Sequence, residues 1–229
     1  MKTLLLGTIA ALSLFGASAA TAQDAGTWSF NVGATSDYVF RGISQTDNNP
    51  AIQGGIDYSN GMFYAGTWAS NVNFAGDEDT TYEIDVYAGV KPKFGNFSMD
   101  FGAAYYAYPN QIKNGNYNFW EFKALASHPV GPGTIGGAFV YSPEWFGKTG
   151  RAYYYELNGS VPVNESLSLS AAIGHQDFDK AKDYNTWNLG LNYMVNDKLS
   201  LDLRYHDTNV HKLGDIYESR VTAMVKATF

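Results

Sequence analysis

The 229-residue chain contains no cysteine, so neither a disulfide framework nor a thiol nucleophile is available to it. It also lacks an excess of basic residues, since 22 Asp and Glu outnumber 15 Lys and Arg, which argues against a nucleic-acid partner. After Phe15 no apolar run approaches the roughly 20 residues that a membrane-spanning helix requires. Helical membrane proteins and nucleic-acid-binding proteins are therefore disfavoured.

Aromatic residues and glycine are abundant: 16% of the chain is aromatic, with 17 Tyr, and there are 24 Gly. This composition suits strands that have one wet and one apolar face better than it suits a helical core. Hydropathy averages near neutrality in such strands, because the two faces alternate along the chain. Periodicity is therefore the more informative property of this sequence.

The first 22 residues are predicted to be a secretory signal peptide. Lys2 precedes an apolar run at residues 4–15, and small residues follow it. The preferred cleavage site lies after Ala22, in the A-x-A type sequence Ala20-Thr21-Ala22. Residues 23–229 then form the folded domain, and the loss of Lys2 leaves it with 22 acidic and 14 basic residues.

The rest of the chain alternates with a period of two. In the last stretch, Val221, Ala223 and Val225 share one face while Arg220 and Lys226 lie on the other. The predicted strands cover residues 28–41, 51–58, 62–74, 82–90, 97–108, 118–127, 134–142, 151–161, 165–175, 186–195, 199–206 and 219–229. In the third strand the alternation sets Met62, Tyr64, Trp68 and Val72 against Ala65, Thr67 and Asn71. The apolar faces are expected to contact lipid and the polar faces water.

The connections between the predicted strands alternate between tight turns and long polar loops. Asn60-Gly61 is a tight turn, whereas residues 43–49 form a long polar loop. Twelve strands in 207 residues allow about 17 residues per strand and connection, enough for the roughly 9 to 11 residues of a tilted spanning strand. The sequence therefore predicts an all-β, antiparallel transmembrane β-barrel of about 12 strands, with short periplasmic turns and longer extracellular loops. The connection at residues 128–133 is longer than the other tight turns, so residues 118–142 are the region where the strand count follows least directly from the pattern.

A soluble β-sandwich or lipocalin-like barrel is the alternative fold, in which the apolar faces point inward. The predicted strands are longer than the usual 5 to 6 residues, and the chain ends on the aromatic Phe229. Both features favour a membrane barrel of the outer-membrane type. Phe229 is expected to close the barrel near Trp28 and to act in recognition by the barrel-assembly machinery.

Strand parity places a set of polar and charged side chains in the barrel lumen. The candidates are Asp37, Arg41, Gln53, Asp57, Glu83, Asp85, Asp100, Glu121, Lys123, Glu156, Asp202, Arg204, Arg220 and Lys226. Their eight acids outnumber their five bases, which predicts a mild preference for cations if water passes. The alternative is that these residues form salt bridges and hydrogen bonds that fill a narrow barrel. We expect Asp37 and Arg41 to pair with each other, or with Gln53 and Asp57, near the outer end of the first strand.

A block near the amino terminus resembles a known porin family. The residues that carry the resemblance are Ser-Asp-Tyr-Val-Phe-Arg-Gly-Ile-Ser-Gln-Thr at 36–46, Pro-Ala-Ile-Gln-Gly-Gly-Ile-Asp-Tyr at 50–58 and Phe-Tyr-Ala-Gly-Thr-Trp-Ala-Ser-Asn-Val at 63–72. This block is similar to the TorF family of porins from Gram-negative bacteria. The resemblance implies an outer-membrane barrel with a channel role and does not name a solute.

Catalysis, cofactors and metals are not expected. His206 and Ser200 share a face, but six residues of extended strand separate them by about 20 Å. Gly131 to Gly136 matches G-x-G-x-x-G but contains Pro132 and opens a strand, so it is a turn. The acids Asp77, Glu78 and Asp79 are more typical of a solvated loop tip than of a calcium site.

The sequence thus predicts a porin that allows passive diffusion of small hydrophilic solutes. Two alternatives stay open: a non-conducting structural or receptor-type barrel that binds through its long loops, and an outer-membrane lipid hydrolase that uses His206. The expected partners are outer-membrane lipid, the assembly machinery and small solutes, with no nucleic acid.

Overall fold

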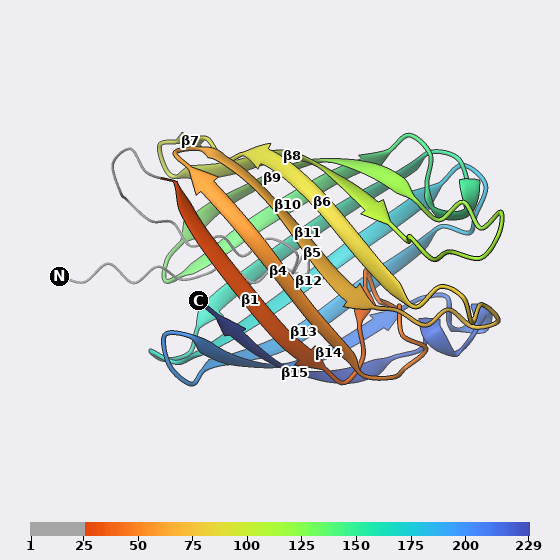
Figure 1. Cartoon of the computed structure of the whole chain (residues 1–229). Coiled ribbons are helices and arrows are strands. Elements are labelled where there is room, and N and C mark those ends of the chain that lie inside the picture. The colour runs from red at the N-terminus through yellow and green to blue at the C-terminus, as the bar shows by residue number, and fades with distance from the viewer. Residues whose placement is uncertain (1–25) are drawn as a thin grey trace.

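A computed structural model describes residues 26–229, and the predicted signal peptide lies outside this part of the chain. The fold is a closed antiparallel β-barrel, in which β1 pairs with β15 and β6 pairs with β8 to complete the ring (Figure 1). Twelve long strands form the wall. They are β1 (Thr27–Thr35), β4 (Ala51–Asn60), β5 (Phe63–Asn71), β6 (Tyr82–Val90), β8 (Phe97–Ala107), β9 (Phe119–Val130), β10 (Gly133–Ser142), β11 (Ala152–Pro162), β12 (Leu167–Phe178), β13 (Tyr184–Met194), β14 (Leu199–Thr208) and β15 (Arg220–Thr228).

Smaller elements complete the structure. The two-residue strand β7 (Lys93–Phe94) pairs with the start of β8, and β2 (Val39–Phe40) pairs with β3 (Ile43–Ser44) as a separate hairpin. Three short 3-10 helices lie in the long loops: η1 (Phe146–Lys148), η2 (His211–Leu213) and η3 (Asp215–Tyr217). No helix within residues 26–229 is long and apolar enough to span a membrane.

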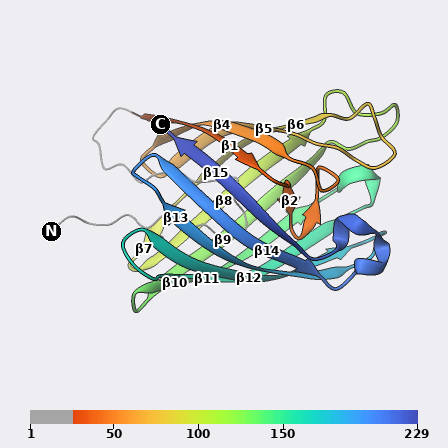
Figure 2. The same ribbon diagram turned by 90° about the horizontal axis from the view of Figure 1, so that it is seen from below.

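The wall strands cross the barrel at a tilt, and the two ends of the barrel differ (Figures 1 and 2). The carboxyl terminus lies at the end that carries the short turns, while the long loops and the 3-10 helices gather at the other end. Among the tight turns, Gly61 and Gly95 adopt φ values of 58° and 60°, which glycine reaches without a Cβ clash. This arrangement confirms the prediction that short turns lie at one end of the barrel and long loops at the other.

The outer face of the wall is apolar and exposed, as expected for contact with lipid. On β1, Trp28, Phe30 and Val32 are exposed, and Gly33 and Thr35 on the other face are buried. Exposed aromatic residues stand near both ends of the wall, in positions typical of the girdles at the two membrane interfaces. They include Trp28, Phe63, Phe97 and Tyr193 at the turn end and Tyr82, Trp120, Trp187 and Tyr205 at the loop end.

Three details of the predicted wall are wrong. The first strand ends at Thr35 rather than at Arg41, because the chain leaves the wall and enters the lumen. In the third strand, β5, the apolar residues Tyr64 and Trp68 face inward and are buried, since Phe63, Ala65 and Ala69 occupy the outer face. Aromatic residues thus fill part of the lumen as well as coating the outside.

The third correction concerns the sixth and seventh strands, which are joined by a tight turn. β9 extends to Val130 and pairs with β10 from Gly133 onward, so that only Gly131 and Pro132 connect them. Pro129 sits within the strand, opposite Thr134. The predicted count of twelve is confirmed.

Candidate functional site

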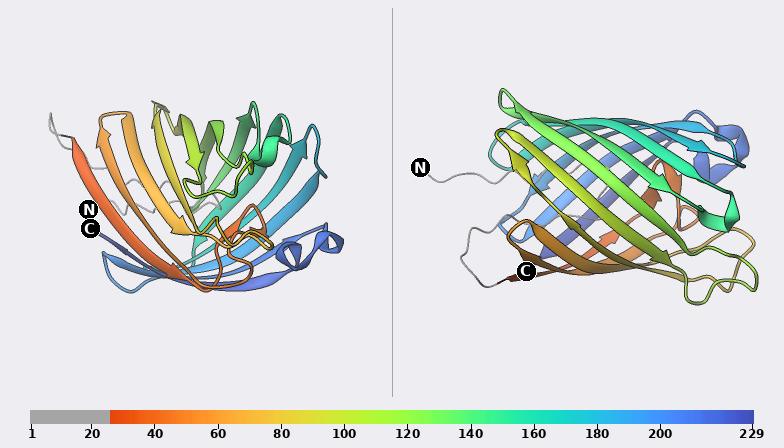
Figure 3. Two further views of the ribbon diagram at one scale, coloured as in Figure 1. Left: turned by 45° about the vertical axis from the view of Figure 1, so that its right-hand side comes forward. Right: turned by 90° about the horizontal axis from the view of Figure 1, so that it is seen from above.

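The most prominent feature of the lumen is a hairpin that folds into it from the first long connection, visible inside the ring in Figure 3. We call residues 37–46 the lumen hairpin; it contains β2, a two-residue turn and β3. In the turn, Arg41 and Gly42 have φ values of 49° and 84°. Positive φ at both turn positions is the geometry that two-residue hairpins favour, and Gly at the second position makes it accessible. A Cβ on Gly42 would lie 2.3 Å from Oγ1 of Thr186, so the tip also packs closely against β13.

The tip of the hairpin reaches the opposite wall of the barrel through Arg41. Nη1 of Arg41 lies 2.8 Å from Oε1 of Glu121 on β9, and Nη2 donates to Oε2 of the same carboxylate at 3.0 Å. Nη1 also donates to Oε1 of Gln176 on β12 at 3.0 Å. In the ring order, β9 and β12 flank the side of the barrel that faces β1. A single side chain therefore connects the hairpin to two distant strands across the lumen.

Arg41 is enclosed by aromatic rings as well as by acceptors. Its guanidinium carbon lies 4.6, 5.3 and 4.3 Å from the ring centroids of Phe40, Trp145 and Tyr154. The residue is only 5% exposed. Cation–π contacts strengthen when they are desolvated, and a buried charge pair is destabilised strongly when one partner is removed. This cluster is therefore the main fixed point of the hairpin tip.

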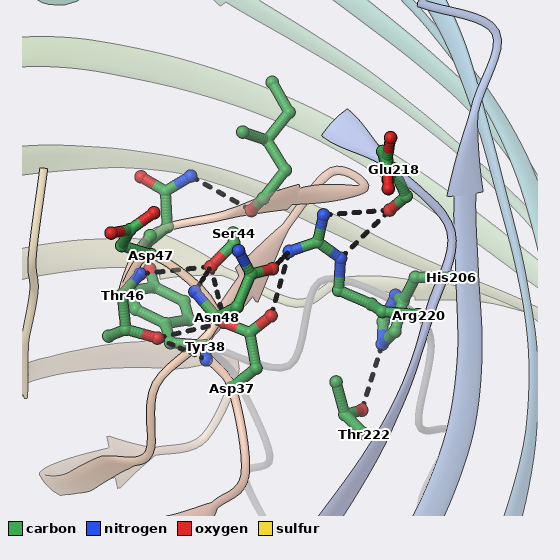
Figure 4. Close-up of polar contacts among 12 residues, drawn as sticks. Asp37, Tyr38, Ser44, Thr46, Asp47, Asn48, His206, Glu218, Arg220 and Thr222 are labelled. Carbon is green, nitrogen blue, oxygen red and sulfur yellow. Dashed lines mark hydrogen bonds and ion pairs between the residues drawn. The ribbon is translucent and has the colours of Figure 1, made fainter. Parts of the chain in front are cut away.

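The base of the hairpin is tied to the last strand (Figure 4). Asp37 accepts hydrogen bonds from Oγ of Ser44 at 2.6 Å and from Nη1 of Arg220 at 3.0 Å. The hydroxyl of Thr46 lies 2.9 Å from the same carboxylate. Arg220 also donates to Oδ1 of Asn48 at 2.6 Å. Asp37 thus joins both arms of the hairpin to β15.

A second acidic group lies on β6, where Tyr38 of the hairpin contacts it. Glu83 on β6 accepts hydrogen bonds from the hydroxyls of Tyr38 at 3.0 Å and Tyr108 at 2.5 Å. Asp85, two residues along the same inward face, is 1% exposed, and neither of its carboxylate oxygens has a hydrogen-bond partner among the described residues. Three buried carboxylates, those of Glu83, Asp85 and Glu121, therefore lie in the outer half of the lumen.

The other predicted lumen residues mostly form local pairs. Lys123 contacts Asp100, and Arg204 contacts Asp202, each at 3.0 Å. Other contacts of this set include Tyr87 to Asp57 at 2.6 Å, Gln53 to Ser70 at 3.5 Å and Tyr154 to Glu156 at 2.7 Å. Lys226 lies on the inward face of β15, opposite Gly33 and Ser200. These contacts account for part of the predicted salt-bridge filling.

The predicted pairing of Asp37 with Arg41, Gln53 or Asp57 is wrong. Both residues follow the end of β1, so their positions no longer obey its parity. Asp37 pairs with Arg220, and Arg41 pairs with Glu121. The Arg-Gly pair between two short β-prone segments is the local sequence feature from which a hairpin could have been inferred, but its inward direction has no local signature.

Above the hairpin, at the loop end of the barrel, lies a cavity of 390 Å³ that we call the outer vestibule. Its lining is predominantly aromatic, and Glu83 is its single acidic residue. The aromatic lining residues are Tyr38, Phe40, Phe74, Tyr106, Tyr108, Tyr117, Phe119, Trp145, Phe146, Phe178, Tyr184 and Tyr217. Several of these rings contact one another, as in the stacked pair of Tyr117 and Phe146, whose centroids are 4.2 Å apart.

The geometry around His206 does not assemble a hydrolase site. Nε2 of His206 lies 3.3 Å from Oγ1 of Thr222 (Figure 4). No Asp or Glu of the described residues hydrogen-bonds to its ring. Ser200 is paired across the sheet with Met194 and Lys226, away from this histidine. A nucleophile, a base and an orienting acid are all required for such chemistry.

The acidic loop at residues 77–79 is organised by its own backbone. Oδ1 of Asp77 accepts hydrogen bonds from the amides of Asp79 and Thr80 at 3.0 Å each, and Oδ2 accepts one from the Thr80 hydroxyl at 2.6 Å. Desolvation raises the pKa of Asp77, but these hydrogen bonds outweigh it and hold the pKa below its ordinary value. Within residues 26–229 no group of three or more His, Cys, Asp or Glu is placed to hold a metal ion.

Comparison with solved structures shows which known folds the barrel is similar to. The KdgM porin superimposes with a TM-score of 0.62 and 12% sequence identity, over 88% of this chain and 99% of that one. The NanC porin superimposes with a TM-score of 0.58 and 10% identity, over 89% of this chain and 99% of that one. At these identities the likeness establishes the fold, that of small porin-like barrels of the outer-membrane type.

Comparison of the sequence supplies the family. No curated protein matches the chain. A family profile described as "Bacterial protein of unknown function (Gcw_chp)" matches residues 19–229, which is nearly the whole chain. The matching profile is that of Gcw_chp, so membership of the TorF porin family, which residues 36–72 resemble, is not confirmed. The chain therefore belongs to the Gcw_chp family of bacterial proteins.

Proposed function

We propose that the protein is an outer-membrane porin that allows small hydrophilic solutes to diffuse passively across the outer membrane of a Gram-negative bacterium. The observation that carries the proposal is the closed ring of twelve strands with an apolar exposed outer face and a polar, charged inner face. The fold that it shares with the KdgM and NanC porins supports the proposal, as does the TorF resemblance of residues 36–72. Export through a signal peptide cleaved after Ala22 belongs to the same proposal.

The lumen hairpin sets the size of the path in this proposal. Barrels of 8 strands are filled by side chains and those of 16 to 18 leave an aqueous channel, so twelve strands lie between these limits. Because the hairpin crosses the lumen and is fixed at the far wall by Arg41, it narrows the path further. We therefore propose a narrow channel with the hairpin as its constriction.

The lumen charges favour cations in the same proposal. Four ion pairs neutralise acids of the predicted set: Arg41 with Glu121, Lys123 with Asp100, Arg204 with Asp202 and Arg220 with Asp37. The acids left without such a pair are Asp57, Glu83, Asp85 and Glu156, against the single base Lys226. Where these carboxyl groups are ionised, their surplus of negative charge raises the local concentration of cations in a pore.

Planar bilayer recording tests the channel proposal directly. The purified protein is expected to insert with discrete conductance steps, and a gradient of KCl should give a reversal potential of the sign for K⁺ preference. Asp57→Asn together with Glu156→Gln should move that potential toward zero, whereas Asp179→Asn, at an exposed loop ion pair, should leave it unchanged. Folded protein that inserts without conductance steps would refute the channel, and an anion-selective potential would refute the charge preference.

A receptor-type, non-conducting barrel is the second candidate function. The observation that favours it is the coincidence of a hairpin across the lumen with an aromatic vestibule at the loop end. In that case the long loops form the binding surface and the barrel serves as their anchor. Silent insertion combined with saturable ligand binding at the loops would favour this candidate over the porin.

Phe229 closes the sheet, and we propose that it also contributes to recognition by the barrel-assembly machinery. Its amide donates to the carbonyl of Phe30 at 2.8 Å, and the amide of Phe30 donates to the carbonyl of Phe229 at 3.0 Å. The contact lies two residues from the expected position at Trp28. Deleting Phe229 is expected to lower the yield of folded barrel in the outer membrane, measured as the heat-modifiable band on gels. Phe97→Ala, which removes another exposed ring but no strand closure, is the control, and equal yields for the deletion and the wild type would contradict the proposal.

A further inference from the structure

We propose that the outer vestibule and the Glu83–Asp85 pair on β6 form a binding site for an organic ammonium ion. The site goes beyond passive diffusion, and it does not depend on whether the barrel conducts. The cavity has a volume of 390 Å³, which lies within the roughly 300 to 1,000 Å³ of small-molecule sites. The occupant that fits this cavity is a cation that is small enough to enter it and apolar enough to lose its hydration water.

The aromatic lining suits a cation that is weakly hydrated. Tyr38, Tyr106 and Tyr108 bring their rings to the cavity wall beside Glu83, the one acidic lining residue. Lys182 is the one basic lining residue, and it is exposed in the loop between β12 and β13. Faces of aromatic rings attract ammonium groups through the ring quadrupole, and the attraction grows when water is excluded.

The protein itself holds a cation by the same chemistry a short distance away. The guanidinium of Arg41 stands over the rings of Phe40, Trp145 and Tyr154 and pairs with the Glu121 carboxylate. Phe40 and Trp145 also line the vestibule. One side of the outer lumen thus combines rings, a carboxylate and a basic side chain, whereas the Glu83 side supplies only the rings and the carboxylates.

Asp85 lies two residues from Glu83 on the same inward face of β6, and although it does not itself line the vestibule, its lack of partners is a second observation that points to a ligand. It is 1% exposed, its two carboxylate oxygens have no hydrogen-bond partner, and no ion pair joins it or Glu83 to a basic side chain within residues 26–229. Its cross-strand neighbours are Trp68 and Tyr106, which are both buried on the inward face. A buried carboxylate without partners is costly, and an opposite charge nearby offsets that cost.

A metal ion fits this arrangement less well than an organic cation. Hard cations such as Ca²⁺ take 6 to 8 oxygen ligands, and no group of three or more potential ligand residues is assembled in residues 26–229. A methylated or otherwise substituted ammonium instead uses ring faces, which line this cavity, and requires negative charge only nearby. The geometry therefore selects an organic ammonium of small size.

Isothermal titration of the detergent-solubilised full barrel tests the site with two probes of nearly equal shape. Choline carries the positive charge, and 3,3-dimethylbutan-1-ol is its neutral counterpart. We expect saturable binding of choline that is at least about tenfold tighter than binding of the alcohol, since the ring quadrupole attracts only the charged probe. Glu83→Gln and Asp85→Asn should each weaken choline binding by about tenfold without changing the binding of the alcohol, because only the charged probe responds to the lost charge.

Asp57→Asn is the matched control, because Asp57 is also a buried inward acid but lies on β4, away from the Glu83–Asp85 pair on β6, and does not line the vestibule. Its choline affinity should equal that of the wild type. Heat-modifiable gel mobility confirms that each variant is folded, and Asp85→Asn, which breaks no hydrogen bond of the structure, covers the case in which Glu83→Gln fails to fold. Equal binding of choline and the alcohol, equal weakening by Asp57→Asn, or no saturable binding by folded protein would each overturn the proposal. Bilayer conductance is a separate readout, so its failure would leave this test intact.

Discussion

Removing the lumen hairpin is expected to raise the single-channel conductance several-fold. In the variant, residues 37–48 are replaced by a short Gly-Ser link between the end of β1 at Thr35 and the start of β4 at Ala51. The twelve wall strands are retained, so that only the obstruction inside the ring changes. Conductance steps are measured in planar bilayers beside the wild type. An unchanged step size from a folded barrel would show that the hairpin does not limit the path.

Point variants at the hairpin tip separate the loss of a fixed tip from the loss of the whole hairpin. Arg41→Ala alone leaves Glu121 as a buried charge without its ion-pair partner, which costs about 3 to 5 kcal/mol of stability. The double variant Arg41→Ala with Glu121→Gln removes that orphan charge, so it should recover most of the stability while the tip stays detached. Its conductance is expected to lie between those of the wild type and the hairpin deletion. Arg151→Ala, which breaks an exposed loop pair with Asp179, is the control and should change neither quantity.

The second large effect is a loss of stability, which we expect when a charged residue is placed on the outer face of the wall. Leu189 lies near the middle of β13 and is 52% exposed on the face that should contact lipid. Leu189→Arg should lower the free energy of unfolding in lipid vesicles by about 2 to 4 kcal/mol, because the guanidinium would sit in hydrocarbon. The measurement is a denaturant titration followed by tryptophan fluorescence.

Val163→Arg is the matched control for the lipid-face prediction. Val163 is 59% exposed but lies in the turn after β11, at the end of the barrel. The cost of arginine falls to about 0 to 1 kcal/mol near the membrane interface. Equal small costs at both positions would indicate that the outer wall faces water, which is the behaviour of a soluble barrel.

The molecule has two parts, the wall of twelve strands and the lumen hairpin. The apolar outer face of the wall suits a bilayer, and in the proposed channel the hairpin limits what passes. The contacts that fix the hairpin include those of Arg41 at the far wall, Asp37 at β15 and Tyr38 at Glu83. A local change at one of these contacts should therefore loosen part of the hairpin and leave the rest in place.

Much of the wall could be predicted from the sequence because a strand has a period of two. Glu83 and Asp85, or Glu121 and Lys123, occupy alternate positions, so a single orientation of the strand sends both members of each pair inward. The even number of strands and the alternation of short and long connections follow from the same pattern and from Gly-containing turns such as Asn60-Gly61. The inward face of β5 does not follow from this pattern, since Tyr64 and Trp68 are apolar enough to face lipid yet lie inward.

The lipid and lumen faces of most wall strands follow from the local sequence, because the side on which each residue lies depends on its immediate neighbours. The path of the lumen hairpin depends instead on contacts that form only in the folded barrel. Arg41 contacts Glu121, 80 residues away in the sequence, and Gln176, 135 residues away. The strands that carry these two residues come within reach of Arg41 only when the ring closes. The same closure places Asp37 beside Arg220, 183 residues away, and leaves Asp85 without a partner. Local periodicity carries no information about contacts across a lumen, because such contacts depend on the number, order and register of all twelve strands.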